Sequence, residues 1–273
     1  MVVKMVKPEI FGSRRSELKN LLEKVKKAKP NIEIFDNIWF GTCLFKYNSD
    51  PKSRYIIFYE CFNDNEFKFK DFTNIKKFFK TYIPFFKIMI QKNSINFIDI
   101  NNQNYFNFKY PLESKKAAKF VLEKVKCDKD VTDDIKTATK DNAPELSKFF
   151  RKDCFGRLAM TDIDFVVVRK DINSAIFIEE KLYTENIENN NFGSIGLGQL
   201  LSLKEIINDV IDTNKNFDFY ILFYNQKKEE WFKWDLKINK EKKYKSYYDE
   251  KYKEIRIIIH DLEKVEIFNL FLK

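Results

Sequence analysis

Two apolar, β-branched runs separated by a short turn constrain the fold of this chain more than any other feature. The first run covers residues 162–169 (DIDFVVVR) and the second covers residues 175–181 (AIFIEEK). Runs of this length and composition are typical of strands, and the five residues between them are too few for a crossover helix. We therefore predict an antiparallel pair, followed by a buried strand at residues 217–224 (FDFYILFY).

Charged side chains stand at one end of this predicted pair. Because side chains alternate along a strand, we expect Asp162 and Asp164 to share one face of the first strand. Glu179 and Lys181 should share one face of the second strand, with Glu180 pointing the other way. Asp164 can then approach Glu179 across the pair. Two facing carboxylates repel each other unless a cation lies between them, and Mg²⁺ accepts one or two carboxylates together with waters and phosphate oxygens.

The composition excludes several other kinds of catalysis. The chain has one histidine, His260, and four cysteines without CxxC spacing. Serine–histidine, cysteine–histidine and histidine–metal chemistry are therefore excluded, and a structural zinc site is disfavoured. The widely spaced cysteines are expected to be small buried hydrophobic residues. Catalysis would have to use carboxylates and lysines.

The run formed by Asp164 and, fifteen positions later, Glu179-Glu180-Lys181 resembles the PD-(D/E)XK nuclease superfamily. That superfamily includes restriction endonucleases, Holliday-junction resolvases and RecB-like nucleases. The expected order of helix, strand, strand, helix and strand over residues 132–224 is similar to its common core. Ile163 stands where the motif has proline. The resemblance implies an α/β fold with a restriction-endonuclease-like core, in which helices flank a mixed central sheet.

The resemblance also implies roles for individual residues. Asp164 and Glu179 match the two metal-binding acids, and the backbone carbonyl of Glu180 would be a further ligand for Mg²⁺, with Mn²⁺ as a substitute. Lys181 matches the catalytic lysine. Gln199, which opens the next predicted helix, is similar to a glutamine that several members place beside the water or phosphate.

Three further residues are alternatives or accessories in this interpretation. Asp162 competes with Asp164 for the metal-binding role. Glu145 could be the additional acid that some members contribute from the preceding helix, although a solvated glutamate after Pro144 is the simpler interpretation. Arg157 could neutralise the carboxylates or bind a phosphate, and a surface arginine is an equal alternative.

We predict that the chain divides after residue 110, since Pro111 follows two short strand-like runs. We predict an N-terminal mixed α+β region at residues 1–110, for DNA binding or assembly. Residues 111–273 would form the nuclease domain with a C-terminal extension. In the first region we expect a helix over residues 13–29 and a second, kinked at Pro84, over residues 72–90. In the second region, the glycines at 193, 196 and 198 predict a flexible loop.

These features together predict a magnesium-dependent deoxyribonuclease that hydrolyses phosphodiester bonds, as an endonuclease in restriction or defence. The alternatives are a recombination or viral DNA-processing nuclease (a junction resolvase or an exonuclease), an RNA endonuclease, and a non-catalytic DNA-binding protein of the same fold. The net charge of +9 and the pI near 9.1 suit a polyanionic partner, most simply double-stranded DNA. The sequence leaves open whether the chain forms a homodimer. Without an apolar stretch long enough for a membrane span, or a signal peptide, we expect an intracellular, cytoplasmic protein.

Overall fold

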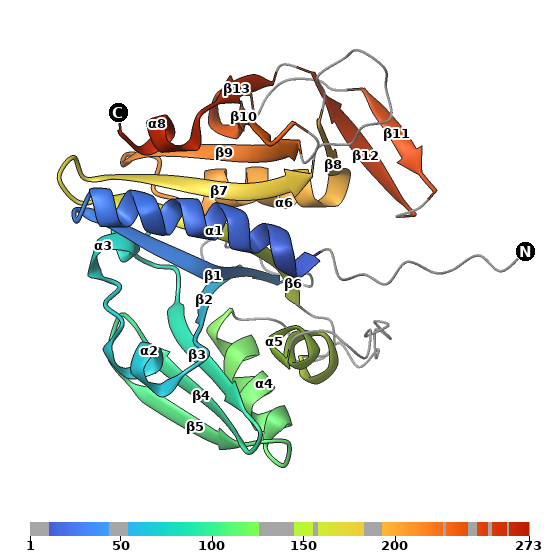
Figure 1. The fold of residues 1–273 in the computed structure, drawn as a ribbon. Helices are drawn as coiled ribbons and strands as arrows, with labels where there is room; N and C mark the ends of the chain where they lie inside the picture. Colours follow the sequence, from blue (N-terminus) through green and yellow to red (C-terminus); the bar gives the residue numbers. More distant parts are fainter. Residues whose placement is uncertain are drawn as a thin grey trace, which may run out of the picture.

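Within the described residues, the protein is an α/β fold built on a ten-stranded mixed sheet (Figure 1). The computed structural model describes residues 11–43, 54–125, 145–154, 158–182, 193–225, 228–239, 245–250, 253–260 and 262–272. The strands of the large sheet are β1 (Ile32–Cys43), β2 (Tyr55–Glu60), β3 (Phe85–Gln91), β4 (Ser94–Asp99), β5 (Tyr105–Lys109), β6 (Leu158–Arg169), β7 (Ser174–Leu182), β9 (Asn216–Asn225), β10 (Glu230–Asp235) and β13 (Glu263–Val265). A smaller sheet contains β8 (Gly193–Gly196), β11 (Ser246–Asp249) and β12 (Glu254–Ile259).

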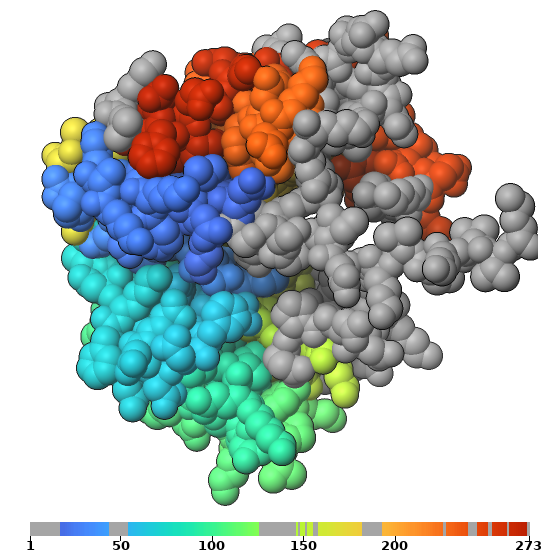
Figure 2. All heavy atoms as spheres, viewed as in Figure 1, coloured from blue at the N-terminus to red at the C-terminus, as the bar shows by residue number. Residues whose placement is uncertain are grey.

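Short helices cover both faces of the large sheet. They are α1 (Phe11–Ala28), α2 (Asp64–Phe69), α3 (Thr73–Lys76), α4 (Ser114–Lys124), α5 (Glu145–Lys148), α6 (Leu197–Glu205), α7 (Leu236–Asn239) and α8 (Ile267–Leu272), with π-helical turns η2 (Phe149–Asp153) and η3 (Ile206–Val210). On one face α1 lies beside α8, and the two are neighbours on the surface in Figure 2. Since α6 and η3 contribute to a different hydrophobic cluster, they cover the opposite face.

The order of strands is β13-β10-β9-β7-β6-β1-β2-β3-β4-β5. β6 is antiparallel to both β1 and β7, as the short turn between β6 and β7 requires. β9 is parallel to β7, and the chain crosses between them through α6 and η3. The predicted antiparallel pair and the buried strand after it are therefore confirmed. Of the expected order helix, strand, strand, helix and strand over residues 132–224, the first helix is described only from Glu145 onward, and the additional strand β8 stands between β7 and α6.

The sheet is continuous across the boundary that we predict after residue 110. β1, from the N-terminal region, pairs with β6 along almost its whole length, from Ile32 opposite Arg169 to Cys43 opposite Leu158. The strands on both sides of residue 110 therefore belong to one sheet. The separate roles of residues 1–110 and 111–273 remain a prediction.

Helix α1 confirms the first helical prediction. Its apolar positions recur at helical spacing, and Leu18, Leu22 and Val25 are completely buried against the sheet. Each such side chain contributes about 1.5–3 kcal/mol to stability through burial. The lysines and glutamates of its outer face are themselves good helix formers, so both faces favour the helix.

The helix predicted over residues 72–90 is wrong. Only Thr73–Lys76 is helical, and Phe85–Gln91 is the strand β3, which pairs in parallel with β2. The first five residues of β3 are all buried, so the strand lacks the alternation that would distinguish it from a helix. Pro84 stands directly before this strand, where it ends one element rather than kinking a helix.

Cys61 and Cys154 are free and buried, as expected. Cys43 is also buried, but it is disulfide-bonded, which its sequence spacing did not indicate. None of the helices in the described ranges combines the length and the apolar character needed to cross a bilayer.

Candidate active site

The structure brings Asp164 and Glu179 together at the point where β6 and β7 separate. Their ladder ends at the pair Phe165 and Ile178, so Asp164 and Glu179 occupy the next opposing positions. Instead of continuing the ladder, the backbone N–H of Glu180 donates a hydrogen bond to Asp164 Oδ2 over 2.7 Å. The two acids are therefore neighbours across the strands, as their spacing predicts.

The strand alternation is interrupted beside Asp164. Ile163 and Val166 belong to the same hydrophobic cluster although they are three residues apart, which strict alternation does not allow. The opposing strand β1 shows the same irregularity, and Asn37, opposite Asp164, is buried with φ of 60°. A positive φ at a non-glycine residue is uncommon and marks a local distortion.

Because of this distortion, the prediction that Asp162 shares a face with Asp164 and Val166 is wrong. Asp162 is paired with Trp39, which packs against the cluster on the opposite side of the sheet from Ile163. Asp162 therefore stands on the far face, although its charge still raises the pKa of Glu179.

Glu179 is the centre of the candidate site. Its side chain is only 3% exposed, and its Oε1 accepts two hydrogen bonds. Lys181 Nζ donates one over 2.5 Å, and Gln199 Nε2 donates the other over 2.6 Å. Burial, helped by the charge of Asp164 and opposed by that of Lys181, raises the pKa of Glu179 to about 8.

The second oxygen of this carboxylate would suit a cation. Glu179 Oε2 is buried, and within the described residues it has no hydrogen-bond partner. An unsatisfied buried carboxylate oxygen costs free energy unless a partner is supplied. A cation between Glu179 and Asp164 would supply that partner and reduce the repulsion between the two charges.

Gln199 reaches Glu179 because of the way α6 begins. Gln199 lies one turn before Leu203, which is completely buried, so both side chains lie on the face of α6 that packs against the sheet. The residues before α6, predicted as a flexible loop, form the buried strand β8. A Cβ on Gly193 would overlap the ring of Phe223, so glycine permits this close approach to β9.

The two accessory residues predicted for this site fall where the structure describes no side chain. Glu145 is the first residue of α5, and its side chain lies outside what the structure describes. Arg157 also lies outside the described residues. Glu180, whose backbone carbonyl is a predicted metal ligand, follows Glu179 directly on β7.

Asn37 is a site neighbour that the sequence interpretation missed. The sequence carries a signal for it, because the polar pair Asp36-Asn37 interrupts an otherwise apolar run. Asp and Asn tolerate left-handed backbone better than most residues do, so such a pair within a strand indicates a local irregularity.

No group of three or more His, Cys, Asp or Glu side chains in the described ranges is arranged to hold a metal ion. Asp164 and Glu179 are two carboxylates, which is the number that Mg²⁺ commonly takes from a protein. Comparisons of the chain with protein-family models, curated proteins and solved structures gave no match.

The position of Asp162 gives a test of the two acids. If the protein cleaves DNA with Mg²⁺ as its sequence predicts, Asp164→Asn should reduce the single-turnover rate by about three orders of magnitude, the scale of losing a metal ligand worth several kcal/mol. Asp162→Asn should reduce it less than about tenfold, because Asp162 acts on Glu179 only through its charge. An inactive Asp162→Asn variant beside an active Asp164→Asn variant would show that the wrong acid has been assigned.

Proposed function

We propose that this protein is a magnesium-dependent nuclease of the PD-(D/E)XK type that hydrolyses phosphodiester bonds in DNA. The observation that carries the proposal is the arrangement around Glu179. Asp164 faces it from the adjacent strand, and Lys181 and Gln199 both donate to its Oε1. Three residues, from two strands and one helix, therefore surround the carboxylate of Glu179.

The topology supports the same proposal. Asp164 and Glu179 lie on two antiparallel strands, and α6 leads from the second of these to a parallel strand beside it. This order of elements is similar to the restriction-endonuclease-like core that the motif implies. Gln199 lies on α6, within the connection between the parallel strands β7 and β9, and its side chain reaches Glu179.

Each residue has a distinct task in the proposed reaction. Mg²⁺, when bound, polarises the phosphate and lowers the pKa of a coordinated water. Asp164 and Glu179 would hold the ion, with the carbonyl of Glu180. Lys181 would orient the attacking water and offset the negative charge that develops on the phosphate. Gln199 holds the Glu179 carboxylate in one orientation.

Glu179 and Lys181 are well placed for chemistry in a water-poor environment. The Glu179 side chain is 3% exposed and that of Lys181 is 21% exposed. Electrostatic interactions are stronger in such surroundings than in water, so a single lysine can contribute several kcal/mol to a charged transition state. The excess positive charge of the chain would favour the approach of a polyanion.

Cleavage assays with several substrates test this proposal. We expect Mg²⁺ or Mn²⁺ to support cleavage of DNA, and EDTA to abolish it. Supercoiled, linear, branched and single-stranded DNA, together with RNA, would distinguish an endonuclease from an exonuclease, a junction resolvase and a ribonuclease. The proposal fails if no nucleic acid is cleaved with either ion, or if EDTA leaves cleavage unchanged.

A further inference from the structure

A pocket rich in lysine lies outside the candidate active site. Its walls come from the end of α2, the turn and helix α3 that follow, the start of β3, and the residues after β4. The pocket has a volume of about 590 Å³, which is within the usual range for small-molecule sites. Asp164, Glu179, Lys181 and Gln199 do not line it.

The charge of this pocket is strongly one-sided. Six lysines line it against one carboxylate, Asp71. The lysines are Lys68, Lys70, Lys76, Lys77, Lys80 and Lys87. In the whole chain 50 basic residues stand against 41 acidic ones, so composition alone does not explain a ratio of six to one. Like charges gathered in one concavity repel each other and favour an anionic ligand.

Three of these lysines are held in place by the fold. Lys87 is only 7% exposed, and its Nζ donates to the backbone carbonyl of Lys70 over 2.6 Å. Lys70 Nζ donates to the hydroxyl of Tyr59 over 2.6 Å and forms an ion pair with Glu66 Oε1 at 3.6 Å. Lys80 Nζ donates to the carbonyl of Asn208 over 2.7 Å. Burial lowers the pKa of Lys87, so a nearby anion would offset the cost of keeping it charged.

The other three lysines also line the pocket and have different surroundings. Within the described residues, Lys68, Lys76 and Lys77 form no ion pair with a carboxylate. The Lys77 Nζ lies 5.6 Å from the centre of the Phe78 ring. The pocket thus combines three lysines that donate hydrogen bonds within the fold with three that have no carboxylate partner among the described residues.

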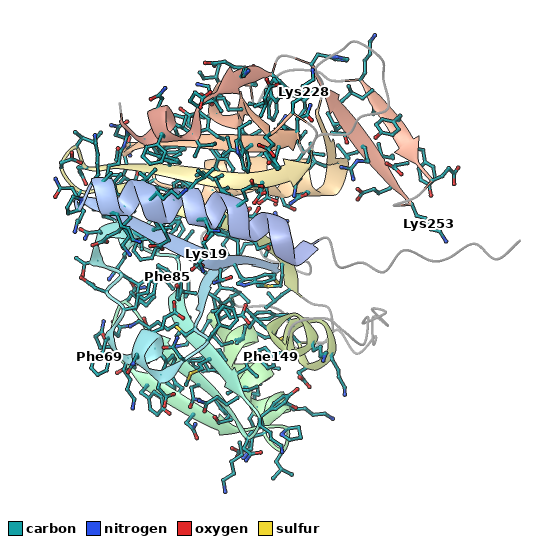
Figure 3. All side chains as sticks on the ribbon, in the orientation of Figure 1. Lys19, Phe69, Phe85, Phe149, Lys228 and Lys253 are labelled. Carbon is teal, nitrogen blue, oxygen red and sulfur yellow. The ribbon has the colours of Figure 1, made fainter. Side chains whose placement is uncertain are left out.

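The floor of the pocket is apolar and aromatic. Phe72, Phe79 and Phe85 line it and are buried, and Lys87 Nζ lies 5.0 Å from the centre of the Phe72 ring. Phe69, at the end of α2, also lines the pocket and is 78% exposed, and Figure 3 labels it beside that helix. An exposed aromatic ring beside ammonium groups can stack on a planar base while the lysines bind phosphates.

We propose that this pocket binds a nucleoside carrying two or more phosphates, through its lysines and its exposed phenylalanine. One phosphate would leave most of the pocket's positive charge unneutralised, whereas two or three phosphates match it better. The same chemistry exists in a free nucleotide and in the phosphorylated end of a nucleic acid strand. A duplex is too wide to enter a cavity of this volume. The inference does not depend on the nuclease proposal, because it concerns different residues.

Binding to the full-length protein, measured by calorimetry in EDTA, tests this inference. The probes are ATP, ADP, adenosine, inorganic phosphate and a 5′-phosphorylated trinucleotide. We expect ATP and ADP to bind with a Kd of about micromolar order, and adenosine and phosphate to bind at least about tenfold more weakly. Tighter binding of the trinucleotide than of ATP would identify the end of a strand as the natural source.

Paired lysine variants make the test specific. Lys76→Gln with Lys77→Gln should weaken ATP binding at least about tenfold. Lys26→Gln with Lys27→Gln, an adjacent exposed pair at the end of α1, should leave it unchanged. Glu179→Gln should also leave it unchanged, since Glu179 does not line the pocket. The proposal is overturned if neither the nucleotides nor the trinucleotide bind saturably, or if both lysine pairs weaken binding equally.

Discussion

Replacement of Glu179 by glutamine is expected to abolish DNA cleavage while leaving the melting temperature unchanged or higher. The substitution keeps the shape of the side chain and an oxygen that can accept from Lys181, but it removes the charge that would hold Mg²⁺. Loss of a metal ligand worth several kcal/mol corresponds to a fall of about three orders of magnitude or more in the single-turnover rate. Activity and melting temperature should therefore change in opposite directions, or activity alone should fall.

The stability change should depend on pH in a defined direction. Because the pKa of Glu179 is raised to about 8 in the folded protein, its ionisation disfavours the fold. In EDTA the increase in melting temperature caused by Glu179→Gln should be smallest below the ordinary glutamate pKa. It should grow as the pH rises towards 8 and then level off. Thermal melts across this range measure it.

Glu180→Gln is the matched control for this variant. Glu180 is the next residue on β7, so its side chain points away from that of Glu179. Only its backbone carbonyl is proposed to contribute, and the substitution keeps that group. Near-normal cleavage by Glu180→Gln beside an inactive Glu179→Gln is expected. Cleavage by Glu179→Gln at the wild-type rate would rule out the proposed site.

The local part of the site could be predicted from the sequence because it depends on short-range periodicities. The two-residue period of a strand places Glu179 and Lys181 on one face, and the salt bridge between them confirms this. The 3.6-residue period of the following helix places Gln199 on the buried face with Leu203. These relations need only a few neighbouring residues.

Long-range relations were not predictable in the same way. The pairing of β1 with β6 joins residues more than a hundred positions apart, and no local pattern in the sequence indicates it. β3 was mistaken for part of a helix because its buried residues conceal the period of a strand. The predicted orientation of Asp162 is wrong because the distortion at Asn37 changes which side chains of β6 share a face. That distortion arises where β1 pairs with β6, so the sequence of β6 alone does not reveal it.

Replacement of Lys181 by alanine should slow the chemical step by about two to four orders of magnitude, the usual scale for a group that assists proton transfer or stabilises charge. Burial alone would lower the pKa of Lys181, but the charge and hydrogen bond of Glu179 outweigh it and raise that pKa. Lys181 is therefore held as a cation, suited to offsetting charge on the phosphate. Single-turnover rates at saturating DNA measure this effect directly.

Binding in Ca²⁺ separates this catalytic role from simple phosphate anchoring. Affinity for DNA should change little in Lys181→Ala, because contacts with backbone phosphates elsewhere supply most of the binding. Lys181→Arg should restore little activity, since the wider guanidinium does not fit the short contact with Glu179 Oε1. Lys215→Ala, which removes an exposed lysine from the turn before β9, should leave both rate and affinity unchanged. If Lys181→Ala instead loses affinity and keeps its single-turnover rate at saturation, Lys181 binds phosphate in the ground state, and the proposed stabilisation of the transition state is wrong.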